Sequence, residues 1–470
     1  MQAGGAGAVS ESFLKGKVTL HCGDCLEVLP TLAENSVDAC VCDPPYHLTS
    51  IIKRFANANV ERENYAVTSH SGYMSRGFMG KQWDGGDIAF RPEVWREVYR
   101  VLKPGAHLLA FGGTRTYHRM ACAIEDAGFE IRDTIMWVYG SGFPKSHDVS
   151  KGIDRAAGAE REVIASGASV KRMIPGADQN KQGWEKTNGR IYVPGERPPI
   201  TAAARQWEGW GTALKPAVEP IILARKPLSE GTVAANVLRW GTGAINVDEC
   251  RVVADDQDKL AVNWDRMQST KQSTIATALS PKKQIHLAEY KKEGRWPANL
   301  IHDGSEEVLA GFPESKSSGG CGDASKKTAL AGHIYGEYSG ETLGQNAGGL
   351  GDSGSAARFF YTAKADTDDR LGSKHPTVKP LDLIQYLVRL VTPLQGMVLD
   401  CFAGTGTMGE AAFREGFRAI LIEREAEYQA DIRRRMALCL SGPDERAREA
   451  VKARMKDKPI DAGPLFGGSV

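Results

Sequence analysis

The chain has 470 residues, of which 41% are hydrophobic and 25% charged, and its formal net charge at pH 7 is +1. This length suits one large α/β domain with a second unit, and the near-neutral charge argues against a protein that coats nucleic acid regardless of sequence. No apolar run approaches the roughly 18 residues that span a bilayer, and no charged-then-apolar signal segment precedes the first predicted strand. We therefore expect a cytoplasmic protein without a membrane partner.

Nine cysteines are spread along the chain. Cys22 and Cys25 form a CxxC pair without a thioredoxin-like context, and Cys40 and Cys42 lie at a predicted strand. A zinc site needs a second close pair at a suitable spacing, and the other cysteines are scattered singly. We therefore expect free thiols and no metal centre.

The first third of the chain alternates between strand and helix patterns after a start over residues 1–16 that we expect to be flexible. We expect strands at 17–24, 37–42, 107–111 and 129–139, and helices at 25–33, 92–102 and 117–127. Strands that alternate with helices indicate a parallel sheet with right-handed crossovers. Residues 47–91 are long, polar and aperiodic, as functional or mobile loops are.

The composition changes after Gly140. Residues 151–357 are rich in glycine, basic residues and isolated tryptophans, so we expect an irregular insert. Within it, 219–226 predicts a strand that returns to the core sheet, and the Gly/Ser-rich segment 315–355 is expected to be partly disordered without a ligand.

Regular patterns resume over residues 358–440. We expect strands at 358–363, 397–401 and 418–423, and helices at 381–391, 409–415 and 426–440. Residues 441–470 carry mixed charges and are expected to be a solvated tail. The predicted fold class is thus α/β, with a mostly parallel sheet built from 17–150 and 358–440.

A stiff polar turn follows the buried strand at 37–42. Asp43-Pro44-Pro45-Tyr46 places a carboxylate, free carbonyl groups and an aromatic ring at the C-terminal edge of a strand, where open α/β sheets bind ligands. That set suits an exocyclic amine on a flat base, because the carboxylate and a carbonyl accept its two hydrogens while the ring stacks on the base. The alternative is an ordinary strand-ending turn.

A glycine loop follows the strand at 397–401. Gly404 to Gly409 matches GxGxxG, and Glu423 follows about 20 residues later, as in dinucleotide-binding folds. Small residues there let backbone N–H groups and a helix N-terminus approach a polar cofactor. Asp400, just before the loop, indicates a ligand with an amine. The loop alone also leaves a nicotinamide oxidoreductase open.

Together the DPPY turn and the Phe402-Ala-Gly-Thr-Gly406 loop resemble those of the DNA amino-methyltransferases, in the order of the family's beta class. His375-Pro-Thr-Val-Lys-Pro380 resembles the family's HPTxKP segment. The resemblance implies a Rossmann-like methyltransferase fold that uses S-adenosylmethionine. Residues 17–150 would be its catalytic half, 358–440 its cofactor-binding half, and 151–357 its target-recognition region.

The resemblance also implies roles for single residues. Asp43, Pro44, Pro45 and Tyr46 would carry the reaction. Asp400 would bind the amino group of the cofactor, Glu423 its ribose and Asp24 its adenine, while Thr377 and Lys379 would bind its carboxylate or hold the loop closed. The complete expected cofactor set is Asp24, Thr377, Lys379, Asp400, Phe402, Ala403, Gly404, Thr405, Gly406, Thr407 and Glu423.

The implied substrate is adenine N6 of a flipped base in double-stranded DNA, because DPPY goes mostly with adenine in the family. Cytosine N4 stays open, since the same geometry serves both amines, and RNA or protein amines are weaker alternatives because such enzymes more often show NPPY. A homodimer and a companion restriction endonuclease also stay open. Candidate DNA contacts, each of which could instead be a solvated surface residue, are Phe143, Lys145, Lys151, Lys171, Arg172, Lys186 and Arg190.

Overall fold

A computed structural model describes residues 9–46, 87–142, 146–162, 184–185, 191–192, 197–252, 295–316, 353–363, 367–373, 375 and 377–455. The chain forms two compact units, a core unit of residues 1–140 and 218–470 and an insert unit of residues 141–217. Within the described residues, no helix is long and apolar enough to cross a membrane.

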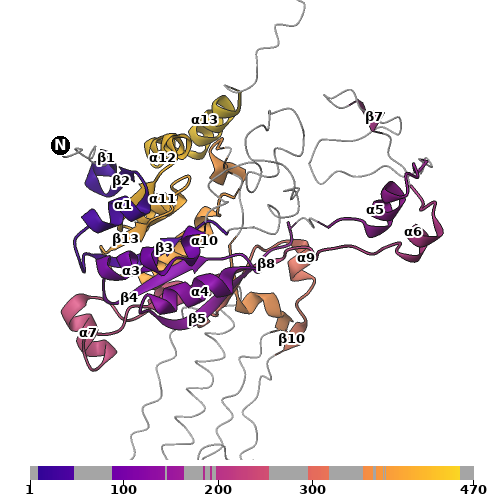
Figure 1. The fold of residues 1–470 in the computed structure, drawn as a ribbon. Helices are drawn as coiled ribbons and strands as arrows, with labels where there is room; N and C mark the ends of the chain where they lie inside the picture. The colour runs from indigo at the N-terminus through magenta and orange to yellow at the C-terminus, as the bar shows by residue number, and fades with distance from the viewer. Residues whose placement is uncertain are drawn as a thin grey trace, which may run out of the picture. The chain divides into compact units, whose positions relative to one another are not determined.

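One ten-stranded sheet forms the centre of the core unit, in the order β1-β2-β14-β13-β3-β4-β8-β5-β9-β12. Two strands from the end of the chain, β13 (Met397–Asp400) and β14 (Arg418–Glu423), lie between β2 (Val18–Cys22) and β3 (Val37–Cys42). Figure 1 shows these early and late elements interleaved in one unit. The expectation of an α/β fold with a sheet built from both ends of the chain is confirmed.

Two strands run against the parallel direction. β1 (Val9–Phe13) pairs antiparallel with β2 at one edge. β8 (Val218–Arg225) lies between β4 (Leu102–Phe111) and β5 (Glu130–Val138) and is antiparallel to both. The first residues of β8 therefore lie at the same sheet edge as the last residues of β3 and β4.

The sheet extends into the part of the chain that was expected to be an insert. β9 (Leu300–His302) pairs in parallel with β5 and with β12 (Tyr361–Thr362). The strand expected at 358–363 is wrong over its first part, where a 3-10 turn, η7 (Ala356–Phe359), precedes β12. The Arg358 guanidinium stabilises this turn, because it donates to the carbonyls of Gly354 and Ser355 at 2.5 and 2.8 Å.

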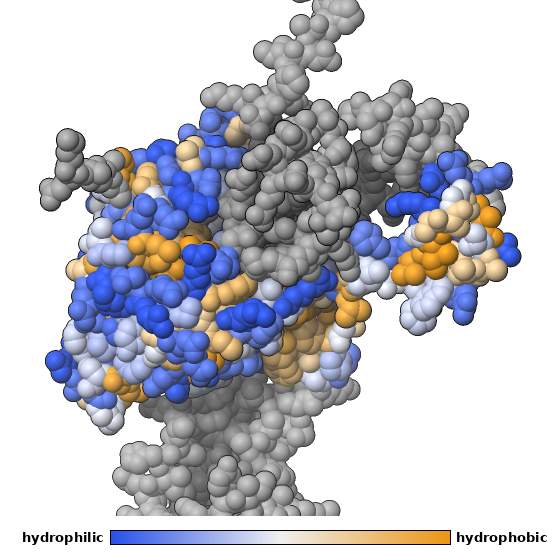
Figure 2. Space-filling model, in the orientation of Figure 1, coloured by the Kyte–Doolittle hydropathy of each residue, from blue (hydrophilic) through white to orange (hydrophobic). Residues whose placement is uncertain are grey.

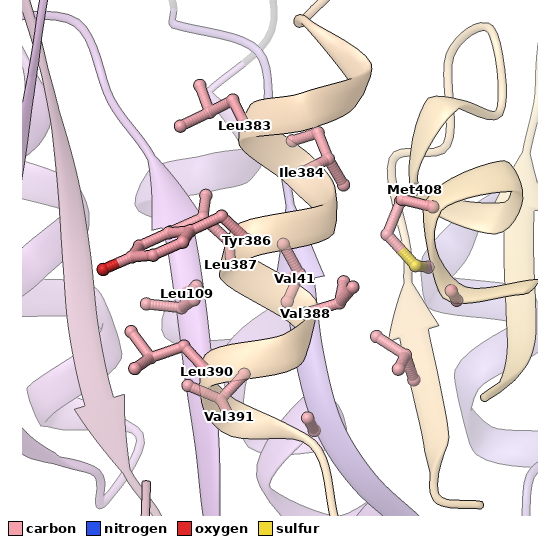
Figure 3. Packing of buried hydrophobic residues seen from close by; sticks show 14 of the residues in the cluster. Val41, Leu109, Leu383, Ile384, Tyr386, Leu387, Val388, Leu390, Val391 and Met408 are labelled. Carbon is pink, nitrogen blue, oxygen red and sulfur yellow. The ribbon is translucent and has the colours of Figure 1, made fainter. Parts of the chain in front are cut away.

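Helices cover both faces of the sheet. On one face lie α1 (Cys25–Val28), α3 (Pro92–Val101) and α4 (Tyr117–Asp126). On the other lie α10 (Leu381–Val391), α11 (Thr407–Arg414) and α12 (Ala426–Leu438). Figure 3 shows α10 against the strands that carry Val41 and Leu109, with Ile384 and Val388 on the side that faces Met408. The apolar i, i+3, i+4 spacing of α10 produces this buried face.

The expected solvated tail is wrong over residues 443–455, which form helix α13 (Pro443–Met455). Arg446 of this helix is 8% exposed and lies 2.7 Å from the fully buried carboxylate of Glu410. Arg435 and Arg414 contact the same carboxylate at 2.8 and 2.9 Å. A buried carboxylate needs cations, and α13 supplies one of them.

We expect Glu410→Gln to lower the free energy of unfolding by about 3 kcal/mol, because it leaves buried guanidinium groups without their anion. Urea unfolding followed by circular dichroism measures this loss. Glu449→Gln on α13, whose carboxylate pairs with Lys452 at the surface, is the control and should change stability by less than about 0.5 kcal/mol. Equal losses in the two variants would contradict the role given to Glu410.

The insert unit contains α5 (Val149–Ala156), α6 (Ala202–Gln206) and the short strands β6 (Trp184–Glu185) and β7 (Ile191–Tyr192). Buried Asp154 joins its helices, since the carboxylate accepts from Thr201 N at 3.0 Å and from Arg161 Nε at 2.6 Å. The boundary of the insert therefore differs from the expected 151–357: the compact unit is 141–217, and 218–357 belongs with the core unit.

Candidate active site

Four acidic residues meet at one edge of the sheet. Asp43 follows β3, Asp400 ends β13, Glu423 ends β14, and Asp24 follows β2. Leu399 of β13 pairs with Cys40 of β3, so the DPPY turn and the glycine loop lie on neighbouring strands although they are more than 350 residues apart. The fold thus brings together the two motifs on which the sequence analysis depends.

Lys379 lies against the DPPY turn. Its Nζ is 2.7 Å from Asp43 Oδ2, 3.1 Å from Glu219 Oε2 and 3.1 Å from the Tyr46 hydroxyl, so each ammonium hydrogen has an acceptor. Burial opposes the ammonium form, but the charges of Asp43 and Glu219 outweigh it and raise the pKa of Lys379. The expected place of Lys379, against the cofactor carboxylate or the glycine loop, differs from these contacts with the DPPY turn.

Glu219 is a site residue that the sequence analysis missed. It is the second residue of β8, and its Oε2 accepts a hydrogen bond of 3.1 Å from the Tyr46 hydroxyl. Burial and the charges of Asp43 and Glu219 raise the pKa of Tyr46 well above its usual value, so the phenol stays protonated and can donate. The strand was predicted, but a parallel strand would have placed Glu219 at the opposite edge of the sheet.

The loop after β4 positions Tyr46 from the other side. Thr116 Oγ1 donates to the Tyr46 carbonyl at 2.9 Å. A Cβ atom at Gly113 would lie 3.3 Å from Cδ2 of the Tyr46 ring, so a glycine there lets the backbone approach the ring closely. Tyr46 is therefore held at its carbonyl, its ring and its hydroxyl.

One oxygen of the Asp43 carboxylate has a partner and the other does not. Oδ2 accepts from Lys379, whereas Oδ1 is buried and has no hydrogen-bond partner in the described part of the chain. A buried acceptor without a donor costs free energy, and such atoms occur where a ligand supplies the missing group. The arrangement leaves one acceptor for an N–H or O–H donor beside the Tyr46 ring.

The glycine loop has the backbone that its sequence requires. Gly404 and Gly406 have φ values of +50° and +75°, which residues with a Cβ atom rarely adopt. Gly406 is the N-cap of α11, so the first N–H groups of this helix face the loop. The buried hydroxyls of Thr405 and Thr407 lie 3.2 Å apart in the same turn.

The segment from His375 to Lys379 connects the two motifs. The His375 Nε2 atom lies 3.5 Å from the position of a Cβ at Gly404, and burial lowers the pKa of this imidazole to about 4, so the ring is neutral. Thr377 is exposed, and its carbonyl lies 3.0 Å from His375 Nδ1. One short segment therefore packs on the glycine loop at one end and on Asp43 at the other.

The carboxylates of Asp400 and Glu423 are buried and bond to the backbone of the loop. Asp400 Oδ1 accepts from Phe402 N at 3.0 Å, and Glu423 Oε2 accepts from Gly404 N at 2.7 Å. Burial raises the pKa of Asp400 to about 8 and that of Glu423 to about 7. A nearby cationic group or hydroxyl donors would favour the charged forms of these two carboxyl groups. The pair of acceptors therefore fits a ligand that carries both a cation and hydroxyl groups.

Asp400 makes the stability of the ligand-free protein depend on pH. The folded-state pKa of Asp400, about 8, lies above its ordinary value of 3.8. The contribution of the protonated carboxyl group to the free energy of unfolding is therefore complete below about pH 4, and it is lost as the pH rises to 8. We expect the Tm to fall by several degrees between pH 5 and 8. Asp400→Asn, which does not titrate, should reduce this fall, and a part due to Glu423 should remain. Thermal unfolding at a series of pH values tests this, and identical falls in both proteins would refute it.

Asp24 caps the helix that follows β2. Its Oδ1 accepts from Leu26 N at 2.9 Å, and its Oδ2 lies 3.5 Å from an Arg424 nitrogen. The capping explains the Asp locally. Its expected contact with an adenine ring stays a prediction, as do the expected contacts of Phe402, whose ring lies 6.4 Å from that of Trp95, and of Ala403.

Among the expected DNA-binding residues, Lys151 is described, at the start of α5, where it is exposed and pairs with Asp148 at 3.1 Å. The others lie outside the described residues: Phe143, Lys145, Lys171, Arg172, Lys186 and Arg190. Figure 2 shows a hydrophobic patch on the insert unit. Trp207 and Trp210 of this unit are 40% and 59% exposed, with ring centroids 5.0 Å apart.

Comparisons with known proteins give a match to one family and matches to parts of related proteins. A family model described as DNA methylase (N6_N4_Mtase) matches residues 37–434. The chain is 25% identical over 241 residues to the type II methyltransferase M.HindIII of Haemophilus influenzae, covering 48% of this chain and 64% of that protein. It is 38% identical over 68 residues to M2.DpnII of Streptococcus pneumoniae, covering 14% and 25%. These matches span less than two thirds of either relative.

Two of the solved structures that are similar to this chain illustrate the likeness. The cytosine-N4-specific PvuII DNA methyltransferase is 13% identical with a TM-score of 0.37, over 93% of both chains. M1.HpyAVI, in its complex with S-adenosylmethionine, is 13% identical with a TM-score of 0.35, over 89% of this chain and 98% of that one.

Proposed function

The chain belongs to the family of N6/N4 DNA methylases, and on that premise we propose that it transfers a methyl group from S-adenosylmethionine to the N6 amine of an adenine flipped out of double-stranded DNA. In the DNA amino-methyltransferases that its DPPY turn and glycine loop resemble, the methyl donor is S-adenosylmethionine. The Asp43 Oδ1 atom, which is buried and has no hydrogen-bond partner among the described residues, carries the proposal, because it is an acceptor that can take an N–H donor of the target base.

The cofactor would bind at the glycine loop. Asp400 would accept from its ammonium group and Glu423 from its ribose hydroxyls, and the backbone of Gly404 to Thr407 would help to hold it. Asp24 would contact its adenine. When bound, the cofactor supplies an electrophilic methyl group next to the DPPY turn.

The DPPY turn would prepare the target nitrogen. The lone pair of an adenine amine is delocalised into the ring, so the amine is a weak nucleophile. Asp43 Oδ1 and the Pro44 carbonyl would accept its two hydrogens and favour a pyramidal nitrogen with an available lone pair, while Tyr46 stacks on the base. A base inside a duplex cannot reach this edge, so flipping is required at a cost of a few kcal/mol.

Lys379 and Glu219 would position these groups. Lys379 bonds to Asp43 Oδ2 and would thereby direct Oδ1 toward the target amine, while Glu219 and Lys379 both bond to the Tyr46 hydroxyl. The acceleration would then come from orientation and from charges placed before the reaction begins. Asp43 is also placed to receive the proton that the amine loses after methylation.

Adenine is the proposed target because the turn begins with Asp rather than Ser. The insert unit is the proposed DNA-recognition part, since it exposes Trp207 and Trp210 and contains the basic stretch around Lys151. Stacking of exposed aromatic rings on bases and contacts of lysine with phosphates are the ordinary means of such binding.

The test uses purified protein, S-adenosylmethionine and unmethylated DNA of mixed sequence. The product is digested to nucleosides and analysed by mass spectrometry, and we expect 6-methyladenine. Sequencing that detects the mark then gives the recognition site. 4-Methylcytosine would overturn the choice of adenine, and an unmodified product with cofactor binding intact would overturn DNA as the substrate.

A further inference from the structure

Three cysteine thiols lie together immediately behind the catalytic edge. The Sγ atoms of Cys40, Cys42 and Cys401 are all within 4.8 Å of one another. Their exposed fractions are 0%, 2% and 2%. They take no part in the mechanism proposed above, and we call them the thiol cluster.

The fold creates this cluster from two distant segments. Cys40 and Cys42 alternate along β3 with Val41, so both thiols point to the face opposite α10, on the side of α1 and α3. β13 pairs with β3 through Leu399 and Cys40, and Cys401 follows two residues later on the same face as Leu399. The spacing of these cysteines along the chain does not reveal that Cys401 lies beside Cys40 and Cys42. The sequence analysis therefore predicts no metal centre.

The sulfur positions suit a soft metal ion. Because no two of these sulfurs are more than 4.8 Å apart, some point lies within about 2.8 Å of all three. Zinc–thiolate bonds are about 2.3 Å long, so small side-chain rotations would bring the sulfurs to that bond length. Thiolates select soft ions over magnesium or calcium.

We propose that Cys40, Cys42 and Cys401 bind one soft, thiophilic metal ion as thiolates. On binding, each S–H bond breaks, its proton passes to solvent and a sulfur–metal bond forms, without a change in oxidation state. Three thiolates with a divalent ion leave one net negative charge, whereas three free thiolates would leave three, so the ion makes the buried charge tolerable.

The position of the cluster couples it to the catalytic edge. Cys42 directly precedes Asp43, and Cys401 directly follows Asp400. A rotation of either thiol toward an ion acts on the backbone of the two residues that carry these carboxylates. This consequence rests on the proposed function, whereas the ion site itself does not.

The experiment measures Cd²⁺ binding to the reduced full-length chain. The parent protein carries Cys22→Ser, Cys122→Ser and Cys321→Ser, which removes the two more exposed thiols of the described residues and the cysteine that lies outside them. Bound Cd²⁺ is counted by equilibrium dialysis, and thiolate–cadmium coordination is followed by its ultraviolet charge-transfer absorption. We expect one ion per chain.

Single alanine variants then locate the ion. Cys40→Ala, Cys42→Ala and Cys401→Ala should each weaken Cd²⁺ binding at least tenfold. The matched control is Cys250→Ala, which removes an equally buried thiol from the other face of the sheet and should leave binding unchanged. Circular dichroism and Tm without metal show whether each variant is folded, and the wild-type chain should gain Tm with Cd²⁺.

Two results would overturn the proposal. One is a parent protein that binds no stoichiometric Cd²⁺ or gives no charge-transfer band, which would make the cluster a packing feature of the core. The other is unchanged binding in the folded alanine variants of the cluster, which would place the ion elsewhere. Both are independent of methylation activity, so a failure of the proposed function does not affect them.

Discussion

Asp43→Ala is expected to lower the rate of methyl transfer by about 10²–10³-fold, the effect of removing one positioned hydrogen-bonding group from a reacting centre. The variant loses the acceptor Oδ1, which is buried and unpartnered in the described residues. It retains Glu219 as an anion for Lys379, which limits the damage to the fold. Single-turnover kinetics with DNA measure the loss, and calorimetry with S-adenosylmethionine should show nearly unchanged binding.

Three further variants help to interpret this result. Asp43→Asn preserves the shape of the side chain but replaces one oxygen by a donor, and should also be slow. Asp133→Ala, at the surface of β5, is the control and should retain activity. Full activity of Asp43→Ala would show that the role given to this carboxylate is wrong. Asp43→Ser adds a test of the target, since the family uses Ser mostly with cytosine.

Lys379→Met is expected to reduce both stability and activity. It removes the cation between Asp43 and Glu219 and leaves two carboxylates close together without compensation. We expect a loss of about 3 kcal/mol in the free energy of unfolding at pH 8, the lower end for such pairs. The two carboxylate side chains remain 23% and 19% exposed, which moderates the cost. Methyl transfer should fall by more than tenfold, since Asp43 and Tyr46 lose a shared anchor.

The stability lost by Lys379→Met should be smaller at low pH than at high pH. Without Lys379, two negative charges stay close together in the folded state without a cation, and a lower pH relieves their repulsion. The variant therefore regains stability as pH falls, and its deficit in the free energy of unfolding relative to wild type should be smaller at pH 5 than at pH 8. Urea unfolding at the two pH values measures it. Lys379→Arg should retain more stability, and Lys151→Met is the surface control. A deficit that is independent of pH would contradict the electrostatic cause.

The substitutions at Asp43 and Lys379 also test a structural idea. We expect the segment from His375 to Lys379 to couple the glycine loop to the DPPY turn. His375 packs on Gly404 and Lys379 bonds to Asp43. A substitution at one end of this segment should therefore also alter the contacts at its other end.

The amino-acid sequence by itself determined the local parts of the site. Asp43 to Tyr46 after an apolar strand, and Gly404 and Gly406 at positive φ before a helix, follow from short patterns in which each residue's own backbone preference decides. That one sheet is built from both ends of the chain was also predicted, because strand and helix patterns resume at 358–440 after the irregular middle. These are properties of neighbouring residues, and neighbours are visible in a sequence.

Only the tertiary structure decided which distant groups touch. Glu410 requires cations, yet nothing in residues 443–455 shows that Arg446 is one of them. The thiol cluster joins Cys40 and Cys42 to Cys401 across a strand pair that no spacing reveals. Such contacts depend on strand order, which is set by the packing of the whole sheet.

Glu219 shows most clearly why the sequence pattern does not determine which distant residues meet. The apolar pattern of 219–225 predicts a strand, but an apolar strand has the same pattern in either direction, so the pattern does not say which end lies beside Asp43. β8 runs antiparallel to β4 and β5, and that direction alone brings Glu219 to Tyr46 and Lys379. Periodicity along the chain predicts which faces are buried, whereas the direction of a strand, and with it the residue at the site, is decided when the sheet assembles.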